Sequence, residues 1–206
     1  MVVALSRVMR NLLRGNINPL VAFAAAWALG ACSSRSASGD IAVGSSAAAI
    51  DRGRALVIFG GCHDCHTPKL MTSAGPILDS TRLLSGSPAR ERIPTVGQGV
   101  LAANGWSIAT TADMTAWTGP WGETFAANLT PDATGLAGWT ADQFIQTMRT
   151  GRRSGTGRAL LPPMPWQNMA ALSDDDLRSL FAYLQSLKPV SNTVPPARAA
   201  ATTARR

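Results

Sequence analysis

The clearest helix signal in the chain lies between residues 173 and 188. Ser173 can cap the first turn, and three aspartates follow it where a helix favours negative charge. Apolar residues then recur every three or four positions, the spacing of one helix face: Leu177, Leu180, Phe181, Leu184 and Leu187. Lys188 and Pro189 end the pattern. We predict a helix that buries this face in a core.

A second helix is predicted to begin after Thr140. Thr140 and Gln143 have the spacing of a capping box, in which each side chain bonds the backbone of the other residue. Behind the box stands an apolar face of Phe144, Ile145 and Met148. The basic segment 149–153 closes this helix. A third apolar face, formed by Ala55, Leu56, Ile58 and Phe59, predicts a helix that leads into residues 60–66.

That third helix leads into the segment with the most reactive side chains, "FGGCHDCHTPK" at residues 59–69. It contains two of the three cysteines in the chain and both histidines. A zinc site would need a second pair of ligands from elsewhere, and a thioredoxin-like redox pair would need a βαβ pattern. Neither feature is found in the sequence, so both are weaker interpretations than the third, in which C-x-x-C-H is an attachment site for haem c.

The spacing of this motif suits a porphyrin. Cys62 and Cys65 are three residues apart, so on a helical turn both sulfurs point the same way and can reach the two vinyl groups of one haem. His66 follows directly and can bind the iron through a ring nitrogen. His63, inside the motif, is expected to face away from the iron. We therefore predict one covalent haem c, held by Cys62 and Cys65 and ligated by His66.

The N-terminal residues 1–31 have the pattern of an export signal. Three arginines precede an apolar run from Pro19 to Leu29, which is about half the length needed to span a bilayer. The sequence "LGAC" that ends at Cys32 resembles the lipobox of bacterial lipoproteins, and this resemblance implies a lipidated Cys32. An ordinary cleaved signal and a retained anchor are the alternatives. We expect a periplasmic protein anchored to a membrane by Cys32.

Composition divides the rest of the chain. Residues 32–48 are rich in Ser, Ala and Gly and are expected to be a flexible tether; residues 191–206 are expected to be a flexible tail. Residues 49–190 form the predicted domain. The formal charge of +7 comes largely from arginines in the export signal and the flexible ends. The domain is therefore close to neutral, and a nucleic-acid partner is not expected.

These blocks together resemble the monohaem c-type cytochromes of the class I kind, from about Ala48 to Pro195. The resemblance implies an all-α fold whose helices wrap around one haem, with the first and last helices crossing at a glycine. Gly53 is the candidate for that glycine, and Tyr183 occupies the place of the family's aromatic residue at the crossing. Residues 79–123 exceed what the family core requires. They are expected to form a long irregular insertion, whose tryptophans either cover the haem or hold a docking loop.

The resemblance also implies the remaining haem ligands. Met164 in "LLPPMPW" stands where the family places its axial methionine; Met169 and an open sixth position are the alternatives. The sequence "GPIL" at residues 75–78 resembles a segment whose proline carbonyl accepts the hydrogen bond of the haem-ligating histidine. Pro76 is thereby implied as the orienter of His66. Leu78, Trp166 and the last helix are expected to wall the haem pocket.

The function implied is electron transfer without enzymatic activity, between a donor and an acceptor redox protein. One alternative is a cytochrome subunit that relays electrons within a membrane-associated dehydrogenase. Another is a haem enzyme or gas sensor with an open sixth site, which would require that Met164 does not bind the iron.

Overall fold

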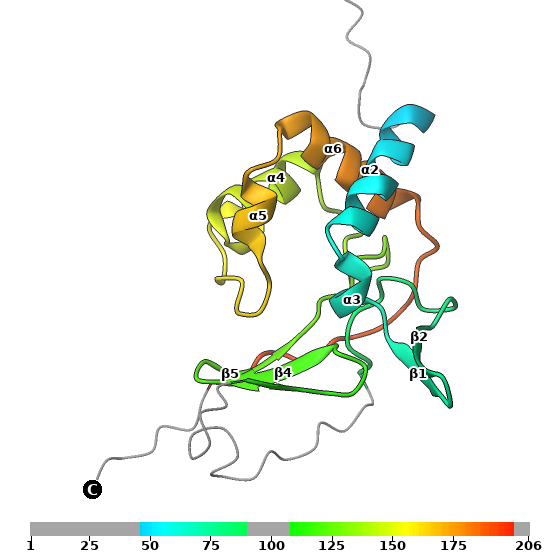
Figure 1. The fold of residues 1–206 in the computed structure, drawn as a ribbon. Helices are drawn as coiled ribbons and strands as arrows, with labels where there is room; N and C mark the ends of the chain where they lie inside the picture. The colour runs from blue at the N-terminus through cyan, green and yellow to red at the C-terminus, as the bar shows by residue number, and fades with distance from the viewer. Residues whose placement is uncertain (1–45, 90–107, 200–206) are drawn as a thin grey trace, which may run out of the picture. The chain divides into compact units, whose positions relative to one another are not determined.

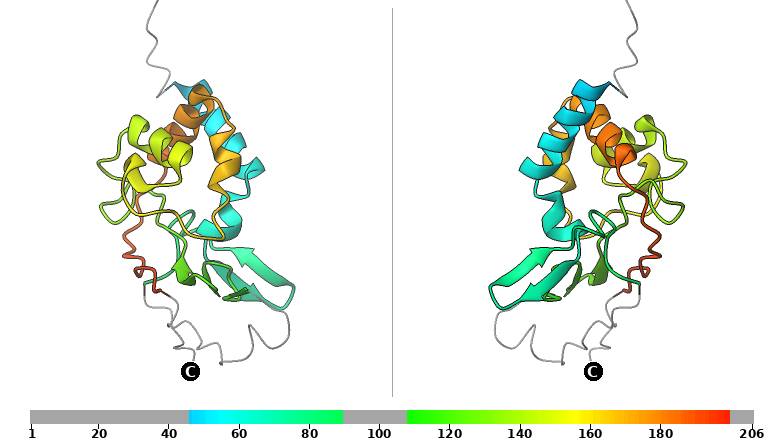
Figure 2. Two further views of the ribbon diagram at one scale, coloured as in Figure 1. Left: turned by 90° about the vertical axis from the view of Figure 1, so that its left-hand side faces the viewer. Right: turned by 90° about the vertical axis from the view of Figure 1, so that its right-hand side faces the viewer.

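The computed structural model describes residues 46–89 and 108–199. Its helices and strands follow in the order α2 (Ala47–Phe59), α3 (Cys62–His66), β1 (Lys69–Thr72), β2 (Gly75–Leu78), β3 (Ala109–Thr110), β4 (Ala116–Gly119), β5 (Gly122–Phe125), α4 (Ala141–Thr150), the 3₁₀ turn η1 (Arg153–Gly155), α5 (Trp166–Ala170) and α6 (Asp174–Ser186). In Figures 1 and 2 the longer helices lie on one side of α3 and the strands on the other. No helix of these residues is both long and apolar enough to cross a membrane.

Helices α2 and α6 cross at Gly53, which confirms the predicted crossing (Figure 1). A Cβ atom at Gly53 would lie 2.0 Å from the backbone oxygen of Ser179 and 2.8 Å from the Cβ atom of Tyr183. Any residue larger than glycine would therefore force the helices apart. Arg52 and Asp176 form an ion pair of 2.8 Å between the same two helices.

The face of α2 that is buried differs from the predicted one. Ala49, Gly53 and Val57 are buried, whereas Ile58 is 65% exposed and Phe59 is 91% exposed. The buried residues are four apart and small enough for α6 to approach closely. Close packing against α6 therefore decided which face turned inward, and the larger apolar residues at the end of α2 point outward.

Helices α4 and α6 were predicted correctly. The Thr140 hydroxyl accepts from the Gln143 N–H at 3.1 Å, and the Gln143 side chain accepts from the Thr140 N–H at 3.0 Å, which completes the capping box. In α6 the Ser173 hydroxyl accepts from the N–H of Asp176. The two helices meet in the core, where the ring centroids of Phe144 and Phe181 are 5.5 Å apart.

The region between α3 and α4 contains strands that the sequence did not predict. Strands β1 and β2 form an antiparallel hairpin, and β3, β4 and β5 form a three-stranded antiparallel sheet. The predicted irregular insertion of residues 79–123 contains β3 and β4 and the start of β5. Residues 90–107 of it, including Trp106, lie outside the described residues. The fold is thus mostly helical, with two small sheets added to it.

The boundaries of the domain also differ from those predicted. Helix α2 begins at Ala47, capped by the hydroxyl of Ser46, so it includes the last two residues of the expected tether. At the other end, residues 191–199 pack against the domain, in contrast to the flexible tail that composition suggested. Arg198 and Glu123 exchange backbone hydrogen bonds of 2.8 and 2.9 Å and also form an ion pair. Contacts with residues distant in sequence therefore hold these residues in place, although their composition is typical of a flexible tail.

Candidate haem-binding site

The short helix α3 presents Cys62, Cys65 and His66 on a single turn and a half. Gly61 caps it with a left-handed φ of 64°, and a Cβ atom there would lie 2.8 Å from a carboxylate oxygen of Asp64. A glycine at this position lets the chain turn sharply from α2 into the motif. The described residues contain no disulfide between the two cysteines, whose thiols remain free for attachment.

The ring of His66 is held by the carbonyl of Ala127, not by Pro76. Nδ1 of His66 lies 2.8 Å from the Ala127 oxygen. Pro76 instead pairs with Met71 in the β1–β2 hairpin, so the prediction for Pro76 is wrong. The hairpin moves the "GPIL" segment away from the histidine, and the segment after β5 takes its place. With Nδ1 donating to a carbonyl, Nε2 is the nitrogen left to bind a metal.

Burial decides the protonation of these groups. It lowers the pKa of His66, against the opposing effect of the hydrogen bond to Ala127, so the imidazole is held in the neutral form that ligates iron. Burial also raises the pKa of the Cys62 thiol to about 11 and raises that of Cys65. Both cysteines are therefore protonated at neutral pH.

The ring of His63 forms a hydrogen bond with a neighbouring side chain. Its Nδ1 atom lies 2.8 Å from the hydroxyl of Thr67, and its ring does not line the cavity described next. Burial lowers its pKa as well. The expectation that His63 faces away from the haem is consistent with this arrangement.

Both cysteines and His66 open onto a cavity of about 570 Å³. Known ligand pockets measure roughly 300–1,000 Å³. Its lining also includes Met164 and apolar side chains of α4 and α6: Phe144, Met148, Leu180 and Leu184. Trp117 of β4 also lines it. This position agrees with the interpretation in which tryptophans of the insertion cover the haem. Leu78 and Trp166 do not line the cavity; the Trp166 ring packs against Gly151 instead.

Three methionines line the cavity: Met148, Met164 and Met169. Met71 is 62% exposed and Met114 is 42% exposed, and neither reaches it. Met164 is half-buried on the loop 160–165, where the Thr124 hydroxyl donates to the carbonyl of Pro162 at 2.9 Å. Met164 thus remains a candidate axial ligand, together with Met169, which the sequence left as an alternative.

Two arginines that the sequence analysis did not single out also line the cavity. Arg153 and Arg158 form no ion pair with any described acidic residue, and the Arg153 guanidinium lies 5.0 Å from the ring centroid of Trp139. Haem carries two anionic propionates, and guanidinium groups bind carboxylates well. Both arginines belong to the basic stretch "TGRRSGTGR" after the middle helix, but only the fold shows that this stretch reaches the cavity.

The donor set therefore fits a haem c. Two thiols three residues apart, a buried neutral imidazole with Nε2 available, a thioether sulfur and two cationic side chains converge on one largely apolar cavity. In the described residues no group of three or more His, Cys, Asp and Glu side chains could hold a metal ion directly. A porphyrin, which supplies four ligands of its own, explains why so few protein ligands suffice.

Comparison with known proteins supports the same identification. Two relatives match most of the chain. A nicotinate dehydrogenase subunit of Pseudomonas putida is 32% identical over 73% of the chain, and the fructose dehydrogenase cytochrome subunit of Gluconobacter japonicus is 29% identical over 71% of it. The cytochrome c subunit of the quinone-dependent alcohol dehydrogenase of Gluconobacter oxydans is 36% identical over 35%. The chain spans only 10%, 23% and 15% of the lengths of these three relatives. Residues 50–188 match the cytochrome c family model, and the chain therefore belongs to the cytochrome c family, whose haem is bound covalently.

Proposed function

We propose that this cytochrome relays single electrons in the periplasm, from a membrane-associated dehydrogenase to a further redox protein, with one haem c. The observation that carries the proposal is the single cavity onto which Cys62, Cys65, His66 and Met164 all open. One haem is supported by the sequence itself, because its three cysteines allow only one C-x-x-C-H motif.

Each protein group has a separate role in holding the haem. Cys62 and Cys65 would bind it through thioethers, so that the cofactor cannot dissociate. His66 would bind the iron through Nε2, because Nδ1 is engaged with Ala127. Arg153 and Arg158 would pair with the propionates. When bound, haem c accepts and releases one electron at its iron.

The axial ligands determine what that iron can do. If His66 and Met164 both bind the iron, no position at the iron would remain for a substrate, which supports electron transfer rather than catalysis. A thioether is a soft ligand that favours the ferrous state and raises the reduction potential. The largely apolar walls of the cavity would limit the access of water to the iron and so raise the potential further.

The relatives support a relay within a larger assembly. The nicotinate dehydrogenase subunit and the fructose dehydrogenase cytochrome subunit are, by their names, parts of dehydrogenases. We infer that this chain accepts electrons from a dehydrogenase partner in the same way. Its electron donor and acceptor are part of the proposal, since the chain covers less than a quarter of either relative.

The test is optical and potentiometric. The ferrous protein should give the low-spin spectrum of a His/Met haem c and titrate as one single-electron centre. The holoprotein should also copurify with a dehydrogenase whose substrate reduces it. A high-spin ferric haem with rapid peroxide turnover would instead favour an enzyme, and a spectrum responsive to small gases would favour a sensor.

We also propose that Cys32, which lies outside the described residues, carries lipid and anchors the protein. The lipobox-like "LGAC" supports this, and two or more acyl chains give stable anchoring where one does not. Labelled palmitate should enter the wild type but not Cys32→Ser, which should lose its membrane association. Equal amounts of both forms in the soluble fraction would argue for an ordinary cleaved signal.

A further inference from the structure

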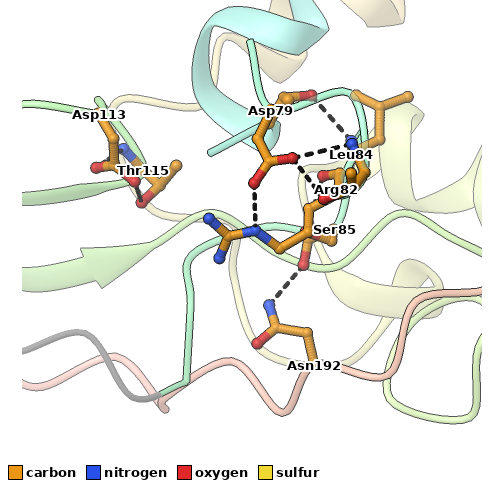
Figure 3. A network of polar contacts seen from close by, with 9 residues as sticks. Asp79, Arg82, Leu84, Ser85, Asp113, Thr115 and Asn192 are labelled. Carbon is orange, nitrogen blue, oxygen red and sulfur yellow. Dashed lines mark hydrogen bonds and ion pairs between the residues drawn. The ribbon is translucent and has the colours of Figure 1, made fainter. Parts of the chain in front are cut away.

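Asn192 lies in the segment that composition assigned to a flexible tail, yet its side chain uses all of its hydrogen-bonding groups. Its Nδ2 atom donates to the carbonyls of Ser85 at 2.7 Å and Ser87 at 2.9 Å, and its Oδ1 atom accepts from the N–H of Ala89 at 3.0 Å. Figure 3 shows the first of these bonds. One amide side chain thus fixes three alternate residues of the loop that follows the β1–β2 hairpin.

That loop forms hydrogen bonds with His66 and with the residue that precedes its acceptor. The N–H of Gly86 donates to the backbone carbonyl of His66 at 2.8 Å. The N–H of Ser87 donates to the carbonyl of Ala126 at 2.9 Å, one residue before the carbonyl that receives the His66 ring proton. The loop therefore holds the histidine and its acceptor relative to each other.

Gly86 brings the loop against the accepting peptide itself. Its φ is +79°, and a Cβ atom there would lie 2.5 Å from the oxygen of Ala126 and 2.7 Å from the oxygen of Ala127. The Ala127 oxygen is the acceptor of His66 Nδ1–H. A small shift of the loop would therefore be transmitted directly to this carbonyl.

The backbone of Asn192 also bonds to the segment that follows Ala127. Its backbone N–H donates to the hydroxyl of Thr134 at 3.0 Å, and that hydroxyl also accepts from the side chain of Asn128 at 3.0 Å. Asn128 directly follows Ala127. Asn192 is thus bonded directly to the 85–89 loop and, through the Thr134 hydroxyl, to Asn128 beside the acceptor.

We propose that Asn192 is a positioning residue that, through the 85–87 loop, fixes the Ala127 carbonyl against Nδ1 of His66 and so sets the orientation of the haem-ligating imidazole. The inference rests on the proposed ligation of haem by His66. It gives the C-terminal segment a role in tuning the iron, although Asn192 contacts neither the histidine nor the haem itself.

The experiment measures hydrogen exchange of the His66 ring. The chain has two histidines, so ¹⁵N-histidine labelling of the ferrous holoprotein gives two sets of ring signals, of which only the haem ligand is shifted by the porphyrin ring current. The exchange rate of the Nδ1–H proton is compared between wild type, Asn192→Ala and Ser191→Ala. Ser191 is the exposed neighbour of Asn192 and serves as the matched control. Amide exchange in α6 reports global opening in the same samples.

Asn192→Ala should accelerate exchange of the His66 proton by about tenfold or more, because the loss of three side-chain hydrogen bonds favours local opening. Ser191→Ala and the α6 amides should keep their wild-type rates. An unchanged rate in Asn192→Ala would overturn the proposal. Equal acceleration of the His66 proton and the α6 amides would also overturn it, because Asn192 would then serve only general stability.

A second variant covers the case in which Asn192→Ala yields no holoprotein. Asn192→Asp keeps the shape and the acceptor for the Ala89 N–H but loses both donated bonds, so it should show the same selective acceleration; wild-type exchange in it would overturn the proposal. Failure of the underlying ligation would look different, because neither histidine of the wild type would then show a ring-current shift.

Discussion

The two walls of the haem cavity are built in different ways. On the His66 wall, the ligand is fixed by backbone groups from two segments distant in sequence, through the Gly86 N–H and the Ala127 carbonyl. On the Met164 wall, the methionine stands in a loop whose neighbouring prolines have no N–H to donate. The Leu160 N–H donates to the Gly151 carbonyl at the start of this loop, and the backbone groups of Met164 bond only to the nearby Leu161 and Trp166. Beyond its start, the loop is held to the rest of the domain by the Thr124 hydroxyl and by side-chain packing, such as the Trp166 ring on Gly151.

This difference indicates which ligand the protein can release. Backbone hydrogen bonds that cross between distant segments constrain both position and orientation, whereas a loop whose backbone bonds are local can move without unfolding its neighbours. The His66 wall should therefore behave as part of the folded core and the Met164 wall as an adjustable one.

The largest effect is expected on the His66 wall. Replacing Cys62 and Cys65 together by alanine should release the haem completely to acid–acetone extraction, since no thioether remains. Each single replacement should leave one thioether and a haem that resists extraction. Retention of haem by the double variant after extraction would show that attachment does not involve these sulfurs.

Removing the Met164 side chain should open the sixth position of the iron, while the fold remains intact. Met164→Ala should let the ferrous protein bind carbon monoxide, which the wild type should not bind, and should lower the reduction potential. Far-UV circular dichroism should stay the same, with a stability loss of about 1–2 kcal/mol for a half-buried methionine.

Met169→Ala is the matched control for that experiment, because Met169 lines the same cavity on α5. It should leave the iron closed to carbon monoxide. If Met169→Ala opens the iron and Met164→Ala does not, the axial ligand is Met169. Carbon monoxide binding by the wild type would mean that the sixth position is open.

Two glycines allow the rigidity of the walls to be compared directly. Gly86 and Gly151 both have positive φ, but an added Cβ atom would meet backbone oxygens at Gly86 and the Trp166 ring at Gly151. Backbone held by hydrogen bonds cannot move aside, so Gly86→Ala should cost about 3 kcal/mol or more. A ring can shift, so Gly151→Ala should cost about 1–2 kcal/mol. Denaturant unfolding of both holoproteins measures the difference, and equal losses would contradict the contrast.

The smallest effect is expected for the turn at residues 79–82, which begins the loop that bonds the backbone carbonyl of His66. Asp79 accepts from the N–H and hydroxyl of Thr81 and pairs with Arg82 at 2.7 Å (Figure 3), and these contacts lower its pKa from 3.8 to about 2. A carboxylate with a lowered pKa stabilises the fold above its ordinary pKa, and this contribution is lost as the pH falls from about 4 toward 2.

Asp79→Asn should therefore lose about 1–2 kcal/mol at pH 7. The difference from wild type should shrink as the pH falls toward 2, because the wild-type carboxylate is then protonated as well. Thermal unfolding followed at both pH values measures this. A difference that stays constant over the pH range would show that the carboxylate charge has no part in the turn.

Local signals in the sequence were sufficient for the elements whose determinants lie within one short segment. The capping box of α4 and the apolar face of α6 depend on neighbours three or four residues away. Gly53 was predicted from the family resemblance instead, because its contacts with Ser179 and Tyr183 are distant in sequence. The spacing of Cys62, Cys65 and His66 likewise predicts a haem attachment turn from five residues, because a helical turn places them on one side.

The acceptor for His66 could not be found in the same way. The sequence offers Pro76 ten residues from the histidine, but the structure uses Ala127, which is 61 residues away and has no side-chain feature to mark it. A backbone carbonyl is present at every residue, so only the folded path of the chain decides which one arrives. The same reasoning explains Arg153 and Arg158, whose approach to the cavity depends on where α4 ends.

The chemistry of the haem turn, the main helices and the match of residues 50–188 to the cytochrome c family all follow from the amino-acid sequence alone. The tertiary structure decided the inward face of α2, the strands in the insertion and the attachment of residues 191–199. The physical reason is the range of the interactions. Caps, helix faces and the haem motif are set by residues within about one or two helical turns, whereas pairing of strands and backbone acceptors depends on segments that meet only after the chain has folded.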